Sequence, residues 1–208
     1  GPFVISDRKT DEYVSIARNE NHFVDGLPYL DSITYLNVGD KTAKRIGLRK
    51  NQFQLARTDS VMRFSDIKEF SKIDHLELAP YEGIAGGAIV LEFNNRTEKL
   101  SNKKVRQAIA YAVDRSKLSN VLHSGYTIPS RSPMPATNVF FNDKLQGYPL
   151  DLDKANSLLD EAGYPKGSDG IRFELNLIFI AQPFMPDFNT MPAEFVAASL
   201  KKVGIKVK

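Results

Sequence analysis

Small and amide-bearing residues gather in one stretch of the chain, where they suit contact with a ligand's backbone. Gly86 and Gly87 follow Ala85, and Asn94 and Asn95 close the apolar run that comes next. Glycine permits a close backbone approach, and the asparagine amide both donates and accepts hydrogen bonds. These residue types favour non-covalent binding over covalent chemistry. The other interpretation is that Gly86 and Gly87 form a bulge in a core strand.

The proline-rich stretch from Gly125 to Pro149 holds a second set of candidate residues. Arg131 stands between two serines there, and three aromatic residues follow it. A connection of this length with little regular structure is usually functional or disordered. The combination predicts a loop at the rim of a binding cleft, with Arg131 as a ligand-binding residue. A simple surface connection is the other interpretation.

The chain carries none of the common catalytic patterns. It lacks the G-x-S-x-G elbow, the phosphate-binding loop, G-x-G-x-x-G and H-E-x-x-H. His22, His75 and His123 are too scattered for a metal-ligand spacing, so we expect surface or structural histidines. The absence of cysteine excludes a thiol nucleophile and a disulfide framework. No catalytic residue, metal or cofactor is predicted, and an α/β enzyme domain with an unrecognised site is the alternative.

Five basic residues cluster on one predicted helix: Lys41, Lys44, Arg45, Arg49 and Lys50. Because no aromatic residue interleaves with them, a solvated helix face is favoured over a phosphate-binding patch. A further hypothesis is that the chain is an interaction module that uses this helix to bind an acidic partner. This hypothesis predicts binding that weakens with salt.

The composition is that of an ordered globular chain. It has 208 residues, of which 42% are hydrophobic and 25% charged, with 28 Lys and Arg against 25 Asp and Glu. A net charge of +3 is too small to indicate nucleic-acid binding, and no apolar run reaches the ~18 residues of a membrane span. An abrupt start at Gly1 and a final strand that ends at Lys208 predict a fragment of a longer protein.

Strands alternate with helices in the predicted order of elements, which indicates α/β architecture. The predicted strands are Phe3–Ser6, Tyr13–Arg18, Ile33–Val38, Phe53–Ala56, His75–Ala79, Ile84–Phe93, Phe173–Ile180 and Val203–Lys208. The predicted helices run from the cap Asp40 to Leu48, over Ser65–Lys72, Asn102–Val113 and Arg115–Leu122, after the cap Asp151, and over Pro192–Lys202. Val105, Ala108, Ile109 and Ala112 form the predicted buried stripe of one helix.

Several segments resemble the periplasmic oligopeptide-binding proteins, the family 5 extracellular solute-binding components of ABC importers. The strongest likeness is L-E-F-N-N at Leu91–Asn95 followed by N-K-K-V-R-Q-A-I-A-Y-A-V-D-R at Asn102–Arg115. Asp153–Pro165 resembles the family's K-A-x-x-L-L-x-E-A-G-Y helix, and Ser199–Val207 its L-K-x-x-G-I-x-V element. Gly1–Phe3 and Leu27–Ile33 resemble two further family segments.

The resemblance implies part of a two-lobed periplasmic-binding-protein fold of type II, with mixed sheets flanked by helices. Residues 1–92 would belong to the first lobe and 93–208 to the second, with the hinge crossing near 90–95. Gly86, Gly87, Asn94 and Arg131 are then the expected ligand-binding residues, while Arg106, Asp114 and Arg115 serve capping and lobe structure. The residue that anchors a peptide's amino group would lie after Lys208.

The implied function is capture of an oligopeptide or dipeptide and its delivery to ABC permease subunits in the inner membrane. The protein would be a monomeric, non-enzymatic binding protein in the periplasm, or lipid-anchored on the outer face of a bacterium without an outer membrane. Family members that bind nickel chelates, haem or sugars leave the cargo open. Hinge closure over the solute is the expected conformational change.

Overall fold

The chain forms two compact units in the computed structural model, Gly1–Val61 and Met62–Lys208. The structure describes residues 1–56, 64–78, 88–132, 134, 138–180 and 186–208. Gly86 and Gly87, two of the predicted ligand-binding residues, lie outside this part of the chain.

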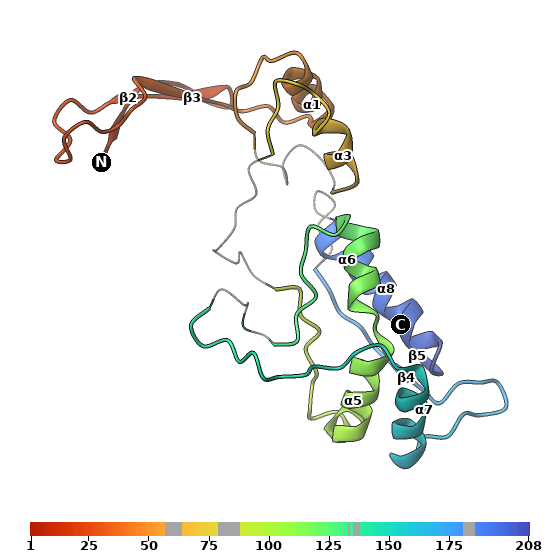
Figure 1. Cartoon of the computed structure of the whole chain (residues 1–208). Coiled ribbons are helices and arrows are strands. Elements are labelled where there is room, and N and C mark those ends of the chain that lie inside the picture. The colour runs from red at the N-terminus through yellow and green to blue at the C-terminus, as the bar shows by residue number, and fades with distance from the viewer. Residues whose placement is uncertain (57–63, 79–87, 133, 135–137, 181–185) are drawn as a thin grey trace. The chain divides into compact units, whose positions relative to one another are not determined.

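The first unit is built on a three-stranded antiparallel sheet. Its strands β1 (Phe3–Lys9), β2 (Tyr13–Arg18) and β3 (Ser32–Leu36) lie in chain order (Figure 1). The first three predicted strands are therefore confirmed. The short connection between β1 and β2 favours their pairing, since neighbouring antiparallel strands can be joined by a tight turn, whereas a longer loop joins β2 to β3.

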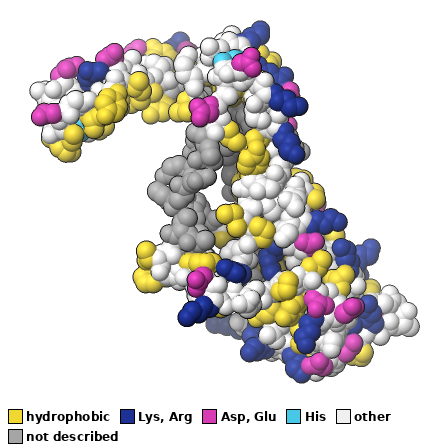
Figure 2. All heavy atoms as spheres, in the orientation of Figure 1, with side chains coloured by type: hydrophobic (Ala, Val, Ile, Leu, Met, Phe, Trp, Pro, Cys, Tyr) yellow, Lys and Arg dark blue, Asp and Glu magenta, His cyan; other side chains and the backbone are white. Residues whose placement is uncertain are grey.

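One face of this sheet carries a row of aliphatic side chains. The register places Ile5, Ile16 and Ile33 opposite one another. Side chains alternate between the two faces of a strand, so Val14 and Tyr35 share that face. Ile5 is 67% exposed and Tyr35 58% exposed, and Figure 2 shows hydrophobic side chains open to solvent along the sheet.

The predicted helix after Asp40 is confirmed as α1 (Lys41–Arg49). The Asp40 carboxylate accepts a hydrogen bond from the Ala43 backbone N–H at 2.7 Å, which satisfies one of the free donors of the first turn. Gly47 allows the Phe53 ring to lie against the helix, because a Cβ at this position would stand 2.2 Å from Phe53 Cε2.

Helices dominate the second unit. A 3-10 turn η1 (Phe64–Asp66) leads into α3 (Ile67–Phe70), followed by α4 (Glu98–Ser101), α5 (Lys103–Ala112), α6 (Arg115–His123) and α7 (Leu152–Glu161). A second 3-10 turn, η2 (Pro186–Phe188), precedes α8 (Thr190–Lys201). Strands β4 (Phe173–Leu175) and β5 (Ile205–Val207) pair in parallel. Mixed helices and strands confirm the predicted α/β class.

The core of the second unit forms where α5 and α7 pack together and α8 meets the β4–β5 pair. The predicted stripe of α5 is buried completely or nearly so. Ile109 of α5 and Leu159 of α7 are 1% and 0% exposed, and Ile205 of β5 is also fully buried. Burial of such aliphatic side chains contributes about 1.5–3 kcal/mol each.

Four predicted strands are wrong in whole or in part. The described residues of the predicted strands 53–56, 75–79 and 84–93 have no strand assignment, and β4 ends at Leu175 instead of Ile180. A strand needs a neighbour to pair its N–H and C=O groups. Apolar composition alone predicts the segment but not that neighbour. The predicted helix 65–72 is likewise divided between η1 and the short α3.

Candidate functional site

Asn94, a predicted ligand-binding residue, is exposed at the turn before α4. Its side-chain Oδ1 accepts a hydrogen bond from the Arg96 backbone N–H at 3.1 Å. Its carbonyl accepts one from the Thr97 N–H at 3.0 Å. This Asx-turn fixes the backbone by a local bond. One of the two lone pairs of Asn94 Oδ1 is thus engaged locally, and Nδ2 has no acceptor among the described residues.

The predicted rim loop, residues 126–149, is anchored at its start by a network of hydrogen bonds to side chains in the C-terminal half of α6. His123 is 1% exposed, and its Nδ1 lies 2.9 Å from Thr127 Oγ1. Its Nε2 donates to the Asp187 carbonyl oxygen at 2.8 Å. Ser119 Oγ donates to the Thr127 carbonyl oxygen at 2.5 Å. His123 is therefore a satisfied structural histidine, as predicted.

Aromatic rings close around the same histidine. The Phe64 ring centroid lies 4.8 Å from that of His123, and the Phe188 centroid lies 5.4 Å from it in a stacked arrangement. These contacts bring η1 and η2 to the C-terminal end of α6. The sequence did not indicate them, because the residues are far apart along the chain.

The end of the loop is anchored by Arg115, at the start of α6. Its Nη2 donates to the Tyr148 carbonyl oxygen, and burial lowers the pKa of this guanidinium. The Tyr148 ring meets the Tyr111 ring edge-on at 5.2 Å, and the Asp151 N–H donates to the Tyr111 carbonyl oxygen at 3.0 Å. Arg115 thus ties the end of the loop to the start of α6, and its predicted structural role is consistent with this contact.

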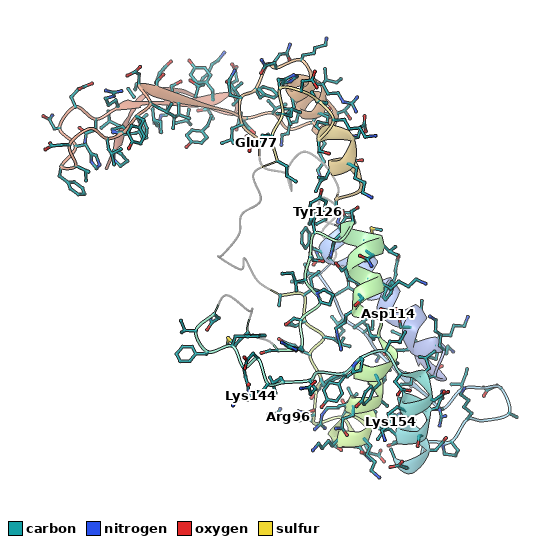
Figure 3. All side chains as sticks on the ribbon, viewed as in Figure 1. Glu77, Arg96, Asp114, Tyr126, Lys144 and Lys154 are labelled. Atoms are coloured by element: carbon teal, nitrogen blue, oxygen red, sulfur yellow. The ribbon has the colours of Figure 1, made fainter. Side chains whose placement is uncertain are left out.

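Arg131 lies within the anchored loop and is exposed. Its guanidinium carbon is 5.8 Å from the centroid of the Phe141 ring, a cation–π distance. Gly147 packs against it from the other end of the loop, since a Cβ at 147 would stand 2.8 Å from Arg131 Cβ. Figure 3 labels Tyr126 at the start of this loop and Lys144 inside it.

The two described candidates, Asn94 and Arg131, belong to different parts of the second unit and share no hydrogen bond with each other. Within the described ranges, no group of three His, Cys, Asp or Glu side chains is arranged to hold a metal ion. The residues around Arg131 offer a cation, serine hydroxyl groups and an aromatic ring, which suit reversible binding of a polar solute.

The family described as bacterial extracellular solute-binding proteins, family 5, middle, matches this chain over residues 1–208. This chain belongs to that family. The resemblance drawn from the motifs is thereby confirmed. Members of family 5 are binding proteins of transport systems rather than enzymes.

Two curated relatives show how wide the family 5 cargo is. The chain is 33% identical to heme-binding protein A of Haemophilus influenzae over 99% of its own length and 36% of that protein. It is 31% identical to the glutathione-binding protein GsiB of Pectobacterium atrosepticum, covering 100% of this chain and 38% of that protein. The chain therefore spans little more than a third of the length of these relatives.

Solved structures place the fold among periplasmic binding proteins, such as DppA of Helicobacter pylori, which matches with a TM-score of 0.66 and 24% identity over 100% of this chain and 38% of that one. NikA of Brucella suis, in complex with Fe(III)-EDTA, matches with a TM-score of 0.86 and 26% identity. The match covers 100% of this chain and 42% of that one. The predicted fold, part of a periplasmic-binding-protein fold, is confirmed. None of the helices in the described residues is both long and apolar enough to cross a membrane.

Proposed function

We propose that this chain is part of the solute-binding component of an ABC import system, which captures a short peptide and delivers it to a membrane permease. The observation that carries the proposal is the family 5 match along all 208 residues. The proposed step is binding, without a covalent reaction. The protein would act as a monomer outside the cytoplasm, in the periplasm.

A peptide cargo is supported by the chemistry of a relative. Glutathione is a tripeptide, and the chain is 31% identical to a glutathione-binding protein over its whole length. A peptide presents backbone N–H and C=O groups along its length, for which an asparagine amide is a suitable partner. Asn94, Gly86 and Gly87 are accordingly proposed as ligand-binding residues, with Arg131 from the loop.

The proposed peptide lies between two lobes, of which residues 1–92 and 93–208 form parts. The chain would cross between lobes near residues 90–95, which places Asn94 beside the crossing. The two compact units of the structure divide earlier in the chain, after Val61. The proposed boundary between the lobes thus differs from the boundary between the compact units, and it is to be tested on the full-length protein.

The test is thermal unfolding of the full-length protein with and without pooled di- to pentapeptides and glutathione. A ligand at about one hundred times its dissociation constant stabilises the folded state by ~2.7 kcal/mol. We expect the unfolding midpoint to rise with at least one peptide pool. No shift with any peptide, together with a shift by another solute, would keep the transport role and reject the peptide.

Haem is the second candidate cargo, because the relative with 33% identity is a heme-binding protein. Haemin and Fe(III)-EDTA therefore belong in the same panel. A rise in midpoint with haemin alone would assign a haem cargo. No shift with any peptide, haemin or chelate would favour an enzyme or interaction module over a transport protein.

A further inference from the structure

Three other arginines of the second unit, Arg106, Arg115 and Arg172, use their guanidinium groups to hold the fold, and Arg131 does not. Arg106 donates to the Leu100 and Ser101 carbonyl oxygens, both at 2.8 Å, and Arg115 donates to the Tyr148 carbonyl. Arg172 pairs with the Asp160 carboxylate. Arg131 makes no ion pair and no side-chain hydrogen bond with any described residue, although an aromatic ring lies beneath it.

We infer that the Arg131 guanidinium binds a carboxylate of the transported solute. The inference rests on the proposed function and deepens it, because it assigns the cargo to the carboxylate-bearing solutes. A guanidinium presents N–H donors in a planar fork that matches the two oxygens of a carboxylate. Arginine is therefore the side chain whose geometry suits that group best.

The Phe141 ring prepares Arg131 for this role. With 5.8 Å between the guanidinium carbon and the ring centroid, the ring faces the cation at a cation–π distance. A ring offers no hydrogen-bond acceptor of a carboxylate's strength. The N–H donors at the edge of the guanidinium therefore stay available to an incoming anion.

The backbone around Arg131 is held in place before any ligand arrives. Gly147 contacts Arg131 across the loop, leaving no room for a side chain there. Ser130 Oγ accepts from the Ser132 N–H at 3.2 Å, and Ser132 Oγ accepts from the Met134 N–H at 3.1 Å. A preformed binding group loses less conformational entropy when the ligand binds.

The ligands of the known relatives share the chemistry that Arg131 would recognise. Haem carries two propionates, glutathione two carboxylates, and EDTA four, although their overall shapes differ. The remaining contacts would then distinguish one cargo from another.

The experiment compares acids with their esters on the full-length protein. The probes are glutathione and its diethyl ester, and haemin and its dimethyl ester, measured by calorimetry or thermal shift. For the acid that binds, we expect wild type to bind its ester about 10- to 100-fold more weakly, because a charge-assisted hydrogen bond is lost. Arg131→Ala should weaken binding of the acid by a similar factor and leave binding of the ester almost unchanged.

Two further variants separate this role from loss of charge or of folding. Arg131→Lys keeps the positive charge but loses the fork, so it should recover only part of the affinity. Arg96→Ala removes another exposed arginine of the same unit, one with no aromatic ring beneath it among the described residues, and should keep the acid–ester ratio. Equal thermal midpoints of the unliganded variants would show that each one folds.

This experiment distinguishes a failure of the Arg131 inference from a failure of the proposed function. Wild type that binds acid and ester equally, or Arg131→Ala that keeps the acid–ester ratio, would overturn this inference while solute binding stands. Binding of neither acid nor ester by wild type would count against both the inference and the proposed cargo. If the difference in affinity between acid and ester disappears in Arg131→Ala and persists in Arg96→Ala, the result would support the inference.

Discussion

The guanidinium of Arg172 donates a hydrogen bond to Asn156 Oδ1 at 3.0 Å and so joins the start of β4 to α7. Its Nε donates to the Val203 carbonyl oxygen at 3.0 Å, on the segment before β5. A further bond goes to the Tyr164 carbonyl, and an ion pair to Asp160. The Arg172 side chain thus connects α7, the turn that follows it, and the segments that lead into β4 and β5.

Replacing Arg172 by alanine should lower the free energy of unfolding by about 2–4 kcal/mol, since several partly buried acceptors would lose their donor. The side chain is only 3% exposed, so water cannot easily take its place. Chemical denaturation of the full-length protein measures the effect. Lys166→Ala, an exposed change on the neighbouring turn, should leave the midpoint almost unchanged. Equal stabilities of the two variants would contradict the role given to Arg172.

Ile109→Ala tests the core at the contact between α5 and α7. The side chain is 1% exposed, and its truncation should cost about 2–5 kcal/mol through lost burial and a remaining cavity. Val121→Ala on α6 is the matched change at a position that is 60% exposed. That variant should stay within about 0.5 kcal/mol of wild type. Thermal and denaturant unfolding should both rank Ile109→Ala as less stable than Val121→Ala.

Gly147→Ala should weaken binding of a carboxylate solute as well as stability, if Arg131 holds that solute. Gly147 has a φ of +69°, and its new Cβ would meet Arg131 Cβ at 2.8 Å. The left-handed backbone alone costs roughly 1–2 kcal/mol for a residue other than glycine. The clash would in addition displace Arg131.

Gly163→Ala is the control for this variant. Gly163 has a φ of +86°, but a Cβ added there would meet no described atom within 4 Å, so it isolates the backbone cost. We expect both variants to lose stability and only Gly147→Ala to lose affinity for the acid probe in calorimetry. The same affinity in both variants would argue that the loop does not position Arg131.

Glu174 provides a test by pH. Hydrogen bonds from Lys206 and Lys208, together with their charges, lower the pKa of this carboxyl from 4.5 to about 2. A lowered pKa in the folded state means that the stabilisation is complete above the unfolded pKa and is lost as pH falls. We therefore expect this contribution to fade between about pH 4.5 and 2.

Glu174→Gln should remove that part of the acid dependence, with little change of stability at pH 2. The Glu174 side chain is partly exposed, so high salt should reduce the difference in stability between the variant and wild type at neutral pH. Unfolding curves recorded across this pH range measure it, and Glu194→Gln on α8 is the control. An unchanged acid profile in Glu174→Gln would show that the pair with the lysines contributes nothing.

The helices were largely predictable from sequence, because their bonds and caps are local. Apolar spacing along α5 identified its buried stripe, and Asp40, Asp114 and Asp151 each cap the helix that follows them. The ordered motifs also identified the family. Each of these signals depends on residues within a few positions of one another.

Strand length and the surroundings of Arg131 needed the tertiary structure. β5 pairs with β4, about thirty residues earlier, and no local pattern specifies that partner or where pairing stops. The sequence predicted Arg131 as a binding residue by its type and place in the loop. Its contacts with Phe141 and Gly147 depend on the path of the loop. That path is fixed by distant anchors, at His123 and Arg115, whose partners become neighbours only when the chain has folded.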